Sequence, residues 1–274
     1  MWKLLRMTTT FFATAALLSA IPFHQTVHSS ALQAIKHHET IVKPVQKSSK
    51  RRKANMSWVE LHKQFPDAFL TNGPRNRKRI ALTFDDAPDH RFTPAILDIL
   101  AKYDVCATFF VVGNRAAKHP SIVRRIHNEG HIIGNHSYNH AVLSTLTLNQ
   151  FRQQILQTDS IIRSEIGYSP HFIRPPYGEL LPQQVMWSKQ AGFTIVNWDV
   201  DSIDWKNNPS SVSIIKNIKK TLQPGSIVLQ HAGGGAGQDL SGTINALPQL
   251  IRLLRSKGYE FVTLPELVNQ PASR

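Results

Sequence analysis

Two adjacent aspartates, Asp85 and Asp86, stand at the end of an apolar run and offer the first chemistry in the chain. Neighbouring carboxylates at the end of a buried strand are partly desolvated and repel each other, unless a cation or a partner charge relieves them. A bound metal ion would do so. A turn or a helix cap before Pro88 is the structural alternative, because Asp is favoured at both kinds of position.

His136 and His140 form a second candidate group, in the segment His136-Ser-Tyr-Asn-His140. Side chains four residues apart on a helical turn project from one face, so both imidazoles could bind one divalent ion. Two histidines and one carboxylate would leave open coordination positions, which catalytic metal sites need. In a chain with 13 histidines, chance alone can also produce this spacing.

The loop Arg174-Pro-Pro-Tyr-Gly178 follows another apolar run. Its two prolines fix the backbone, so we expect Arg174 to point along the strand end toward the neighbouring acids and to keep a carboxylate ionised. An ordinary proline-rich surface loop would have the same composition.

Acids, an indole and a histidine follow two further apolar runs. Asp201, Asp204 and Trp205 lie in Asp-Ser-Ile-Asp-Trp, and His231 ends the run Ile-Val-Leu-Gln-His, where it could titrate near neutral pH. A packed indole and a core histidine are the commoner roles for such residues. The conjunction of all these groups favours a single site.

The elements that must position these residues alternate along the chain. Seven short apolar runs are predicted as strands, at 79–84, 107–112, 131–134, 172–174, 194–198, 226–229 and 260–263. Six segments between them have helical spacing, at 93–103, 121–129, 149–166, 182–190, 210–222 and 244–257. This alternation predicts βα units and a parallel sheet, either open and doubly wound or closed into a barrel. In both folds, polar residues that follow the strands gather at one face.

The N-terminal residues differ in composition from the rest. Lys3 and Arg6 followed by an uncharged, largely apolar stretch predict a signal peptide or an N-terminal membrane anchor over residues 1–31. Residues 32–56 are predicted as a basic flexible linker, and 57–77 as a lead-in helix and turn. Residues 1–55 hold nine Lys or Arg against the single acid Glu39, whereas the rest of the chain holds 23 against 17.

That charge distribution bears on partners and location. The basic linker is either solvated or attracted to an anionic cell-wall polymer or membrane surface, and nucleic acid is not expected as a partner. We expect a protein that is secreted, or held at the outer cell surface or cell wall by an uncleaved N-terminal segment. The single Cys106 cannot form an intrachain disulfide, and we predict a small buried residue there.

Five segments in this order together resemble the motifs of the polysaccharide deacetylase family, also called the NodB-homology family or carbohydrate esterase family 4. They are Thr83-Phe-Asp-Asp-Ala-Pro88, His136-Ser-Tyr-Asn-His140, Arg174-Pro-Pro-Tyr-Gly178, Asp201-Ser-Ile-Asp-Trp205 and Ile227-Val-Leu-Gln-His231. The resemblance covers residues 78–268. It implies an α/β fold, a distorted (β/α)7 barrel with a single catalytic domain.

The resemblance also implies a divalent metal ion, zinc, with cobalt, nickel or manganese as alternatives. Asp86, His136 and His140 match the metal ligands of the family. Asp85 matches the general base, and His231 matches the general acid that protonates the leaving amine.

The other matched positions support these groups. Arg174 matches the residue that orients the base Asp85, and Asp204 matches the carboxylate that holds His231. The residues that match substrate-binding positions are Tyr177, Trp205 and Leu229. The first would donate its backbone N–H to an anionic intermediate, and the other two would form walls of the acetyl pocket.

The activity that the resemblance implies is removal of N-acetyl groups from N-acetylglucosamine-type units of a polysaccharide, either peptidoglycan or a chitin-like polymer. The alternatives are an O-acetyl esterase on xylan or another acetylated glycan, and a non-catalytic cell-wall-binding protein. Ala87 departs from the usual glycine, which would strain the chain if a positive φ were needed there. The glycine-rich run 233–237 lacks the Lys-Ser/Thr of a phosphate loop, so we predict a flexible rim loop.

Overall fold

The computed structural model describes residues 56–274. The expected signal peptide or anchor (1–31) and the expected linker up to residue 55 lie outside this range. Among the described residues, no helix combines the length and apolar character needed to cross a membrane.

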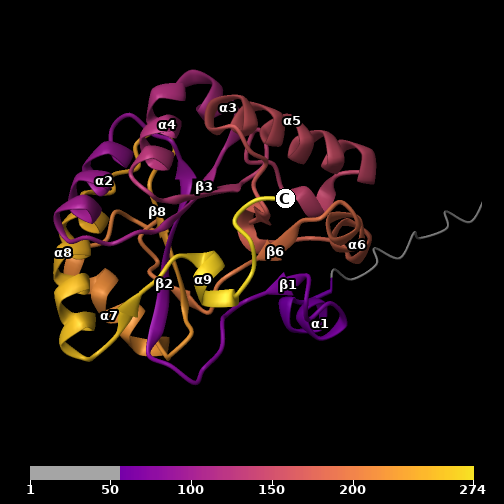
Figure 1. The fold of residues 1–274 in the computed structure, drawn as a ribbon. Helices are drawn as coiled ribbons and strands as arrows, with labels where there is room; N and C mark the ends of the chain where they lie inside the picture. The colour runs from indigo at the N-terminus through magenta and orange to yellow at the C-terminus, as the bar shows by residue number, and fades with distance from the viewer. Residues whose placement is uncertain (1–55) are drawn as a thin grey trace, which may run out of the picture. The chain divides into compact units, whose positions relative to one another are not determined.

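A single sheet of nine short strands forms the centre of the fold (Figure 1). The strands lie in the order β1-β6-β5-β4-β3-β2-β8-β7, and β9 pairs with the start of β2. Their bounds are β1 (Phe69–Leu70), β2 (Arg79–Ala87), β3 (Thr108–Val111), β4 (Ile132–Asn135), β5 (Phe172–Ile173), β6 (Thr194–Val196), β7 (Val200–Asp201), β8 (Ile227–His231) and β9 (Glu260–Phe261). The ladders between them are parallel.

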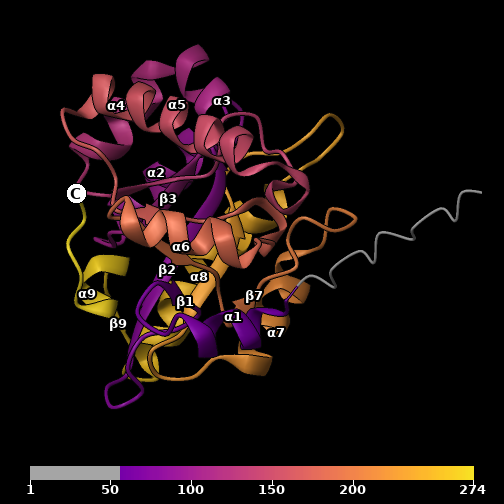
Figure 2. The same ribbon diagram turned by 90° about the vertical axis from the view of Figure 1, so that its right-hand side faces the viewer.

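The sheet curls into a half-barrel with helices on its outer side (Figures 1 and 2). The helices are α1 (Trp58–Gln64), α2 (Thr93–Lys102), α3 (Gly113–Lys118), α4 (Pro120–Asn128), α5 (Leu148–Ile166), α6 (Pro182–Gln190), α7 (Ser211–Thr221), α8 (Ser241–Ser256) and α9 (Leu264–Val268). The architecture is therefore a distorted (β/α)7 barrel, and the open doubly wound alternative is wrong.

The half-barrel is open between its end strands β1 and β7, which no ladder joins within residues 56–274. The chain between β6 and β7 crosses this opening, which we call the seam. The Asn197 N–H donates to the Leu70 carbonyl oxygen (2.8 Å), and the Asp199 N–H donates to the Ile227 carbonyl oxygen (3.4 Å). The predicted strand 194–198 is shorter in the structure, because its last residues leave one edge of the sheet and approach the other.

The structure contains all predicted helices and strands, and among the described residues it adds four short β-strands and α-helices that were not predicted. All six predicted helices are present as α2 and α4–α8, and the lead-in helix is α1, which begins with a capping box between Ser57 and Glu60. The strands β1 and β7 and the helices α3 and α9, of two to six residues each, were not predicted, because no clear apolar pattern marks them. Phe69, assigned to the lead-in helix, is buried in β1 instead.

Cys106 was expected to be buried, and this prediction is wrong. The side chain is exposed, whereas its neighbours Val105 and Ala107 are buried. The strand β3 begins only at Thr108, so Cys106 belongs to the turn that leads into it.

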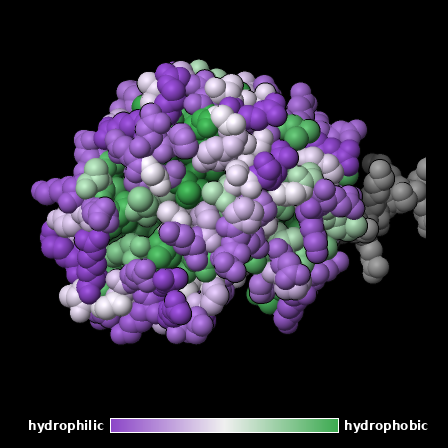
Figure 3. Space-filling view, in the orientation of Figure 1, coloured by the Kyte–Doolittle hydropathy of each residue, from purple (hydrophilic) through white to green (hydrophobic). Residues whose placement is uncertain are grey.

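Apolar side chains fill the space between the sheet and the outer helices. The largest cluster joins β2 and β3 to α2 and α8 through residues such as Phe84, Phe109 and Leu250, all completely buried. The face that carries the C-terminal segment is mainly hydrophilic, with small apolar patches (Figure 3). Because β2 lies between β3 and β8, the residues at its carboxyl end have a rigid support.

Candidate active site

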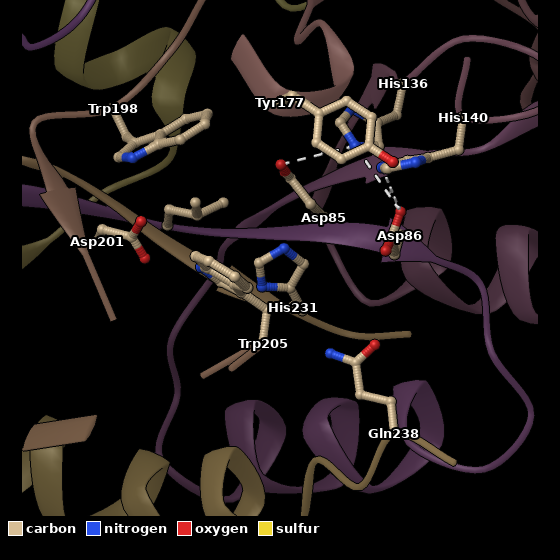
Figure 4. A pocket seen from close by; sticks show the side chains of 11 residues that line it. Asp85, Asp86, His136, His140, Tyr177, Trp198, Asp201, Trp205, His231 and Gln238 are labelled. Atoms are coloured by element: carbon tan, nitrogen blue, oxygen red, sulfur yellow. Dashed lines mark ion pairs between the residues drawn. The ribbon is translucent and has the colours of Figure 1, made fainter. Parts of the chain in front are cut away.

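A pocket of about 380 Å³ lies at the carboxyl ends of the strands (Figure 4). Its lining residues are Asp85, Asp86, His136, His140, Tyr177, Trp198, Asp201, Trp205, Leu229, His231 and Gln238. The convergence predicted from the strand ends is confirmed. Arg174 and Asp204, the two remaining predicted site residues, are buried behind this lining.

A break in the β2 ladder brings both aspartates into the same pocket. Successive residues of a regular strand point to opposite faces, so adjacent Asp85 and Asp86 would normally diverge. The β2/β3 register shifts between Phe84 and Ala87, and Asp86 has a φ of 65°. An irregularity of this kind redirects a side chain, and here it turns the Asp86 carboxylate toward the same pocket as Asp85.

Arg174 is completely buried and holds Asp85 in place. Its Nη1 donates to Asp85 Oδ1 (2.9 Å) and to Thr83 Oγ1 (2.7 Å). Its Nε and Nη2 donate to the carbonyl oxygens of Val196 and Asn197 (3.1 Å each). The predicted orientation of Arg174 toward the acids is therefore confirmed.

The same surroundings set the protonation of Asp85. Burial raises the pKa of this carboxyl, which is 3% exposed, and the adjacent Arg174 guanidinium opposes that rise. A raised pKa makes a carboxylate a better proton acceptor than an ordinary surface aspartate.

His136 is fixed in one tautomer. Its Nδ1 lies 2.7 Å from the Arg174 carbonyl oxygen. Since a carbonyl oxygen only accepts, we assign the proton to Nδ1, which leaves the Nε2 lone pair facing the aspartates. Burial and the neighbouring His140 lower the pKa of His136 to about 3, so the ring is neutral at physiological pH.

The two histidines do not lie on a helical turn, and that part of the prediction is wrong. Residues 136–140 form a loop in which Ser137 and His140 have φ values of 65° and 59°. Gln154 of α5 holds this loop, because its Oε1 accepts from the N–H groups of Tyr138 (2.9 Å) and Asn139 (3.2 Å). The rings nevertheless lie 5.1 Å apart between centroids, so a loop achieves the proximity that a helix was expected to give.

Asp86, His136 and His140 fit a divalent cation. One ligand atom of each lies within 4.8 Å of the other two. His140 Nε2 is 3.3 Å from Asp86 Oδ1, and His136 Nε2 is 3.8 Å from the same oxygen (Figure 4). This oxygen is buried and has no hydrogen-bond partner among the described residues. Buried polar atoms are almost always satisfied, so the arrangement indicates a cation as the missing partner.

His231 and Asp204 form a pair on the other side of the pocket. His231 Nδ1 lies 2.7 Å from Asp204 Oδ1, and the His231 backbone N–H donates to Asp204 Oδ2 (2.9 Å). Thr243 of α8 also donates to Oδ2 (2.8 Å). Burial alone would lower the pKa of His231, but the Asp204 carboxylate outweighs it and raises this pKa to about 9. The imidazole is therefore protonated at neutral pH.

Aromatic and apolar side chains surround the mouth of the pocket. Tyr177 is 60% exposed and its ring packs edge-to-face on His140, with centroids 5.1 Å apart. Trp205 is 48% exposed, and Leu229 of β8 lines the same pocket. Exposed rings around a polar floor suit a ligand with both apolar and polar faces.

Arg115 belongs to the site and was missed by sequence reasoning. Its Nη1 donates to the Asp86 carbonyl oxygen (2.8 Å), and its Nη2 to the Gly234 carbonyl oxygen (3.4 Å). Arg115 lies on α3, whose six residues were not predicted as a helix. No periodicity or motif in the sequence would have indicated its role.

Ala87 and the glycine-rich run 233–237 were the two segments whose effect on the site was in question. Ala87 is buried and its φ is not positive, so the methyl group causes none of the strain that was considered. Gly233 packs tightly, because a Cβ atom there would lie 2.2 Å from the Asp86 carbonyl oxygen. Gly235 and Gly237 are exposed, and Gln238 reaches the pocket, in agreement with the predicted position at its rim.

Comparison with known proteins agrees with this geometry. A family model described as polysaccharide deacetylase matches residues 72–196. A peptidoglycan-N-acetylglucosamine deacetylase of Bacillus cereus is 45% identical over 218 residues, which span 80% of this chain and 76% of the relative. The chain therefore belongs to the polysaccharide deacetylase family.

Two further similarities refine this assignment. A chitooligosaccharide deacetylase of a Bradyrhizobium species is 35% identical over 199 residues, or 69% of this chain and 90% of the relative. Among solved structures, the Bc1960 peptidoglycan N-acetylglucosamine deacetylase is 46% identical, with a TM-score of 0.73 over 75% of this chain and 94% of that one.

Proposed function

We propose that this protein is a metal-dependent N-deacetylase that removes acetyl groups from N-acetylglucosamine-type units of a polysaccharide. The observation that carries the proposal is the placement of Asp85 and His231. They are register partners in the β2/β8 ladder, so a carboxylate and a protonated imidazole face the pocket from neighbouring strands at the same level. Amide hydrolysis needs such a base and such an acid together.

Asp85 acts as the general base. A divalent cation held by Asp86, His136 and His140 would supply positive charge that acidifies water and polarises the acetamide carbonyl. Asp85 accepts the proton of the attacking water at its free oxygen, Oδ2, while Arg174 keeps the other oxygen fixed by a hydrogen bond. Arg174 thus positions the base without touching the substrate.

His231 acts as the general acid. Its Nδ1 is engaged by Asp204, so Nε2 is the nitrogen that donates a proton to the leaving amine. An amine leaves readily only when protonated, and the raised pKa of His231 keeps the acid form available at neutral pH. The Asp204 carboxylate stabilises the imidazolium and fixes its orientation.

The walls of the pocket position the acetyl group. Trp205 and Leu229 supply its apolar contacts, and the backbone N–H of Tyr177 would donate to the anionic oxygen of the intermediate. Tyr177 has a φ of 60° within a short 3-10 turn, which aims its peptide away from the regular strand direction.

The relatives support peptidoglycan as the polymer. The Bacillus cereus relative is named for peptidoglycan N-acetylglucosamine, and the Bradyrhizobium relative for chitooligosaccharide. Both names share the N-acetylglucosamine unit, so we assign that sugar as the substrate unit and a chitin-like polymer as the second candidate.

We further propose zinc as the metal and the outside of the cell as the location. Two imidazoles and one carboxylate suit zinc, while cobalt, nickel or manganese could occupy the same ligands. The signal-like residues 1–31 support export, and the basic residues that follow support attraction to an anionic cell-wall polymer or membrane surface.

The test is acetate release by the full chain from N-acetylglucosamine oligomers and from peptidoglycan, with and without a chelator. We expect release that needs the metal and that is lost in Asp85→Asn and His231→Ala. Acetylated xylan in parallel distinguishes an O-acetyl esterase. Metal-loaded, folded protein that releases acetate from none of these substrates would contradict the proposal and favour a non-catalytic wall-binding protein.

A further inference from the structure

A second cavity of about 360 Å³ lies at the seam of the half-barrel, next to the active-site pocket. Trp198 and Asp201 line both cavities, so the two share a wall. These two residues lie on the side of the pocket away from Asp86 and His140 (Figure 4). The second cavity therefore adjoins the pocket on the side away from the metal ligands.

Trp58 of α1 forms part of the second cavity, although it precedes the segment matched by the family model. Its ring packs edge-to-face on Trp198, with centroids 4.7 Å apart. It also packs against the catalytic loop, since a Cβ atom on Gly178 would lie 2.0 Å from Trp58 Cζ2. Residues of β7 and α7 supply other walls of the cavity. The helix α1 is thus fixed against the site.

The walls of this cavity combine apolar and polar surface. Ile203 is 37% exposed and has a φ of 54°, which is unusual for a β-branched residue. The Asp201 Oδ1 accepts from the Ile203 N–H (2.7 Å) and holds this turn. Backbone strain of this kind clusters at functional sites, including ligand sites. Lys220, which is exposed and also lines the cavity, adds a charged donor.

We propose that this cavity binds a sugar ring next to the unit that is deacetylated. A pyranose has apolar C–H faces and a polar edge of hydroxyl groups, which matches indole and isoleucine surfaces flanked by Asp201 and Lys220. The inference rests on the proposed function, because it extends the same substrate along the polymer. It assigns α1 a role in selecting longer glycans.

The rival explanation is that Trp58 only supports the loop that carries Tyr177. The two explanations differ in their dependence on substrate length. A lost sugar contact weakens only substrates long enough to reach the cavity, whereas a displaced loop weakens all of them equally.

The experiment uses the full chain and N-acetylglucosamine oligomers of increasing length. For Trp58→Ala we expect kcat/KM to fall about tenfold more on long oligomers than on the shortest one that is turned over. Ile203→Asn should show the same length dependence without disturbing α1, because Asn tolerates a positive φ. Val59→Ala is the matched control on α1, since Val59 is 63% exposed and lies outside the cavity.

An equal loss on all oligomers, or no loss in either variant, would overturn the proposal. Thermal unfolding and metal content verify that each variant is folded and loaded. Calorimetric binding of the same oligomers to the same proteins tests the cavity independently of turnover. If the wild-type protein binds long oligomers through Trp58 but releases no acetate, the proposed activity fails and the sugar site stands.

Discussion

The two sides of the active-site pocket are held together in different ways. On one side, both oxygens of Asp204 are occupied by hydrogen bonds from His231 and Thr243. On the other side, Asp86 Oδ1 is buried among two imidazoles and receives no hydrogen bond from the described residues. The chain itself therefore supplies all the hydrogen-bond partners of the Asp204–His231 pair, whereas the proposed metal ligands still need a cation.

The hydrogen bonds to Asp204 form when the chain folds, whereas the partner of Asp86 Oδ1 is supplied only by metal binding. A buried carboxylate with a full set of donors is stable without further partners. A buried carboxylate oxygen that receives no hydrogen bond is stabilised when a positive charge joins it. Changes on the metal side should therefore alter metal affinity, and changes on the acid side should alter the pH profile.

The largest effect is expected for Asp86→Ala. Cation charge contributes several kcal/mol to hydrolysis, and each 1.4 kcal/mol is tenfold in rate, so kcat/KM should fall by at least about 10³-fold. Steady-state acetate release and metal content after dialysis measure the two consequences together. Asp98→Ala is the control, since Asp98 is an exposed acid paired only with Arg125. Retention of both metal and activity in Asp86→Ala would contradict the assigned ligand set.

On the acid side, His231→Ala should lower kcat by about 10²- to 10³-fold, which lies within the range typical of a lost general acid. Metal affinity should stay near that of the wild type, because His231 is not among the metal ligands. Titration with metal and a competing chelator distinguishes the two sides. A large loss of metal in this variant would show that the two sides are not independent.

A smaller effect on the metal side is expected for Arg115→Ala. Arg115 does not touch the metal position but fixes the Asp86 backbone through its carbonyl oxygen. Loss of such support typically weakens metal affinity by about 10- to 100-fold. Excess metal should restore most of the activity.

Arg91→Ala is the matched control for that experiment. Arg91 also donates to the Gly234 carbonyl oxygen but makes its other hydrogen bonds to Asp89, not to Asp86. Equal losses of metal affinity in both variants would mean that the glycine-rich loop, rather than the Asp86 backbone, controls binding.

The sequence predicted the buried charged pairs better than it predicted the orientation of Asp86. The pairing of Asp204 with His231 and of Arg174 with Asp85 was predicted from the family resemblance, and the structure brings each pair together. The way in which Asp86 is aimed was not predicted. Its direction depends on a ladder irregularity and a φ of 65°, which residue types do not specify.

In the fold, too, local patterns were easier to predict than features that depend on long-range contacts. Helices such as α5, with 19 residues, contain enough turns for their apolar spacing to be read, whereas α3 and β7 do not. The seam was also beyond prediction, because the partners of Asp199 and Trp58 are set by long-range packing. Sequence patterns thus located the strand ends, and tertiary contacts fixed how side chains there are oriented.

The smallest effect at neutral pH is expected for Asp204→Asn, which tests the charge on the acid side. His231 must be protonated to act as an acid, and its pKa of about 9 keeps it so at pH 7. Since Asp204 is the main group that raises this pKa against burial, its loss should lower the pKa. The acid form, present below the pKa and lost above it, is then lost at a lower pH than in the wild type.

The measurement is kcat against pH for Asp204→Asn and wild type at saturating metal. The alkaline limb of the wild type should lie near pH 9, and that of the variant should lie at a clearly lower pH. Metal affinity should not change, which separates this variant from Arg115→Ala. An alkaline limb that stays in place would mean that the wild-type limb reports another group, and the charge of Asp204 would then serve only to hold the β7–α8 region together.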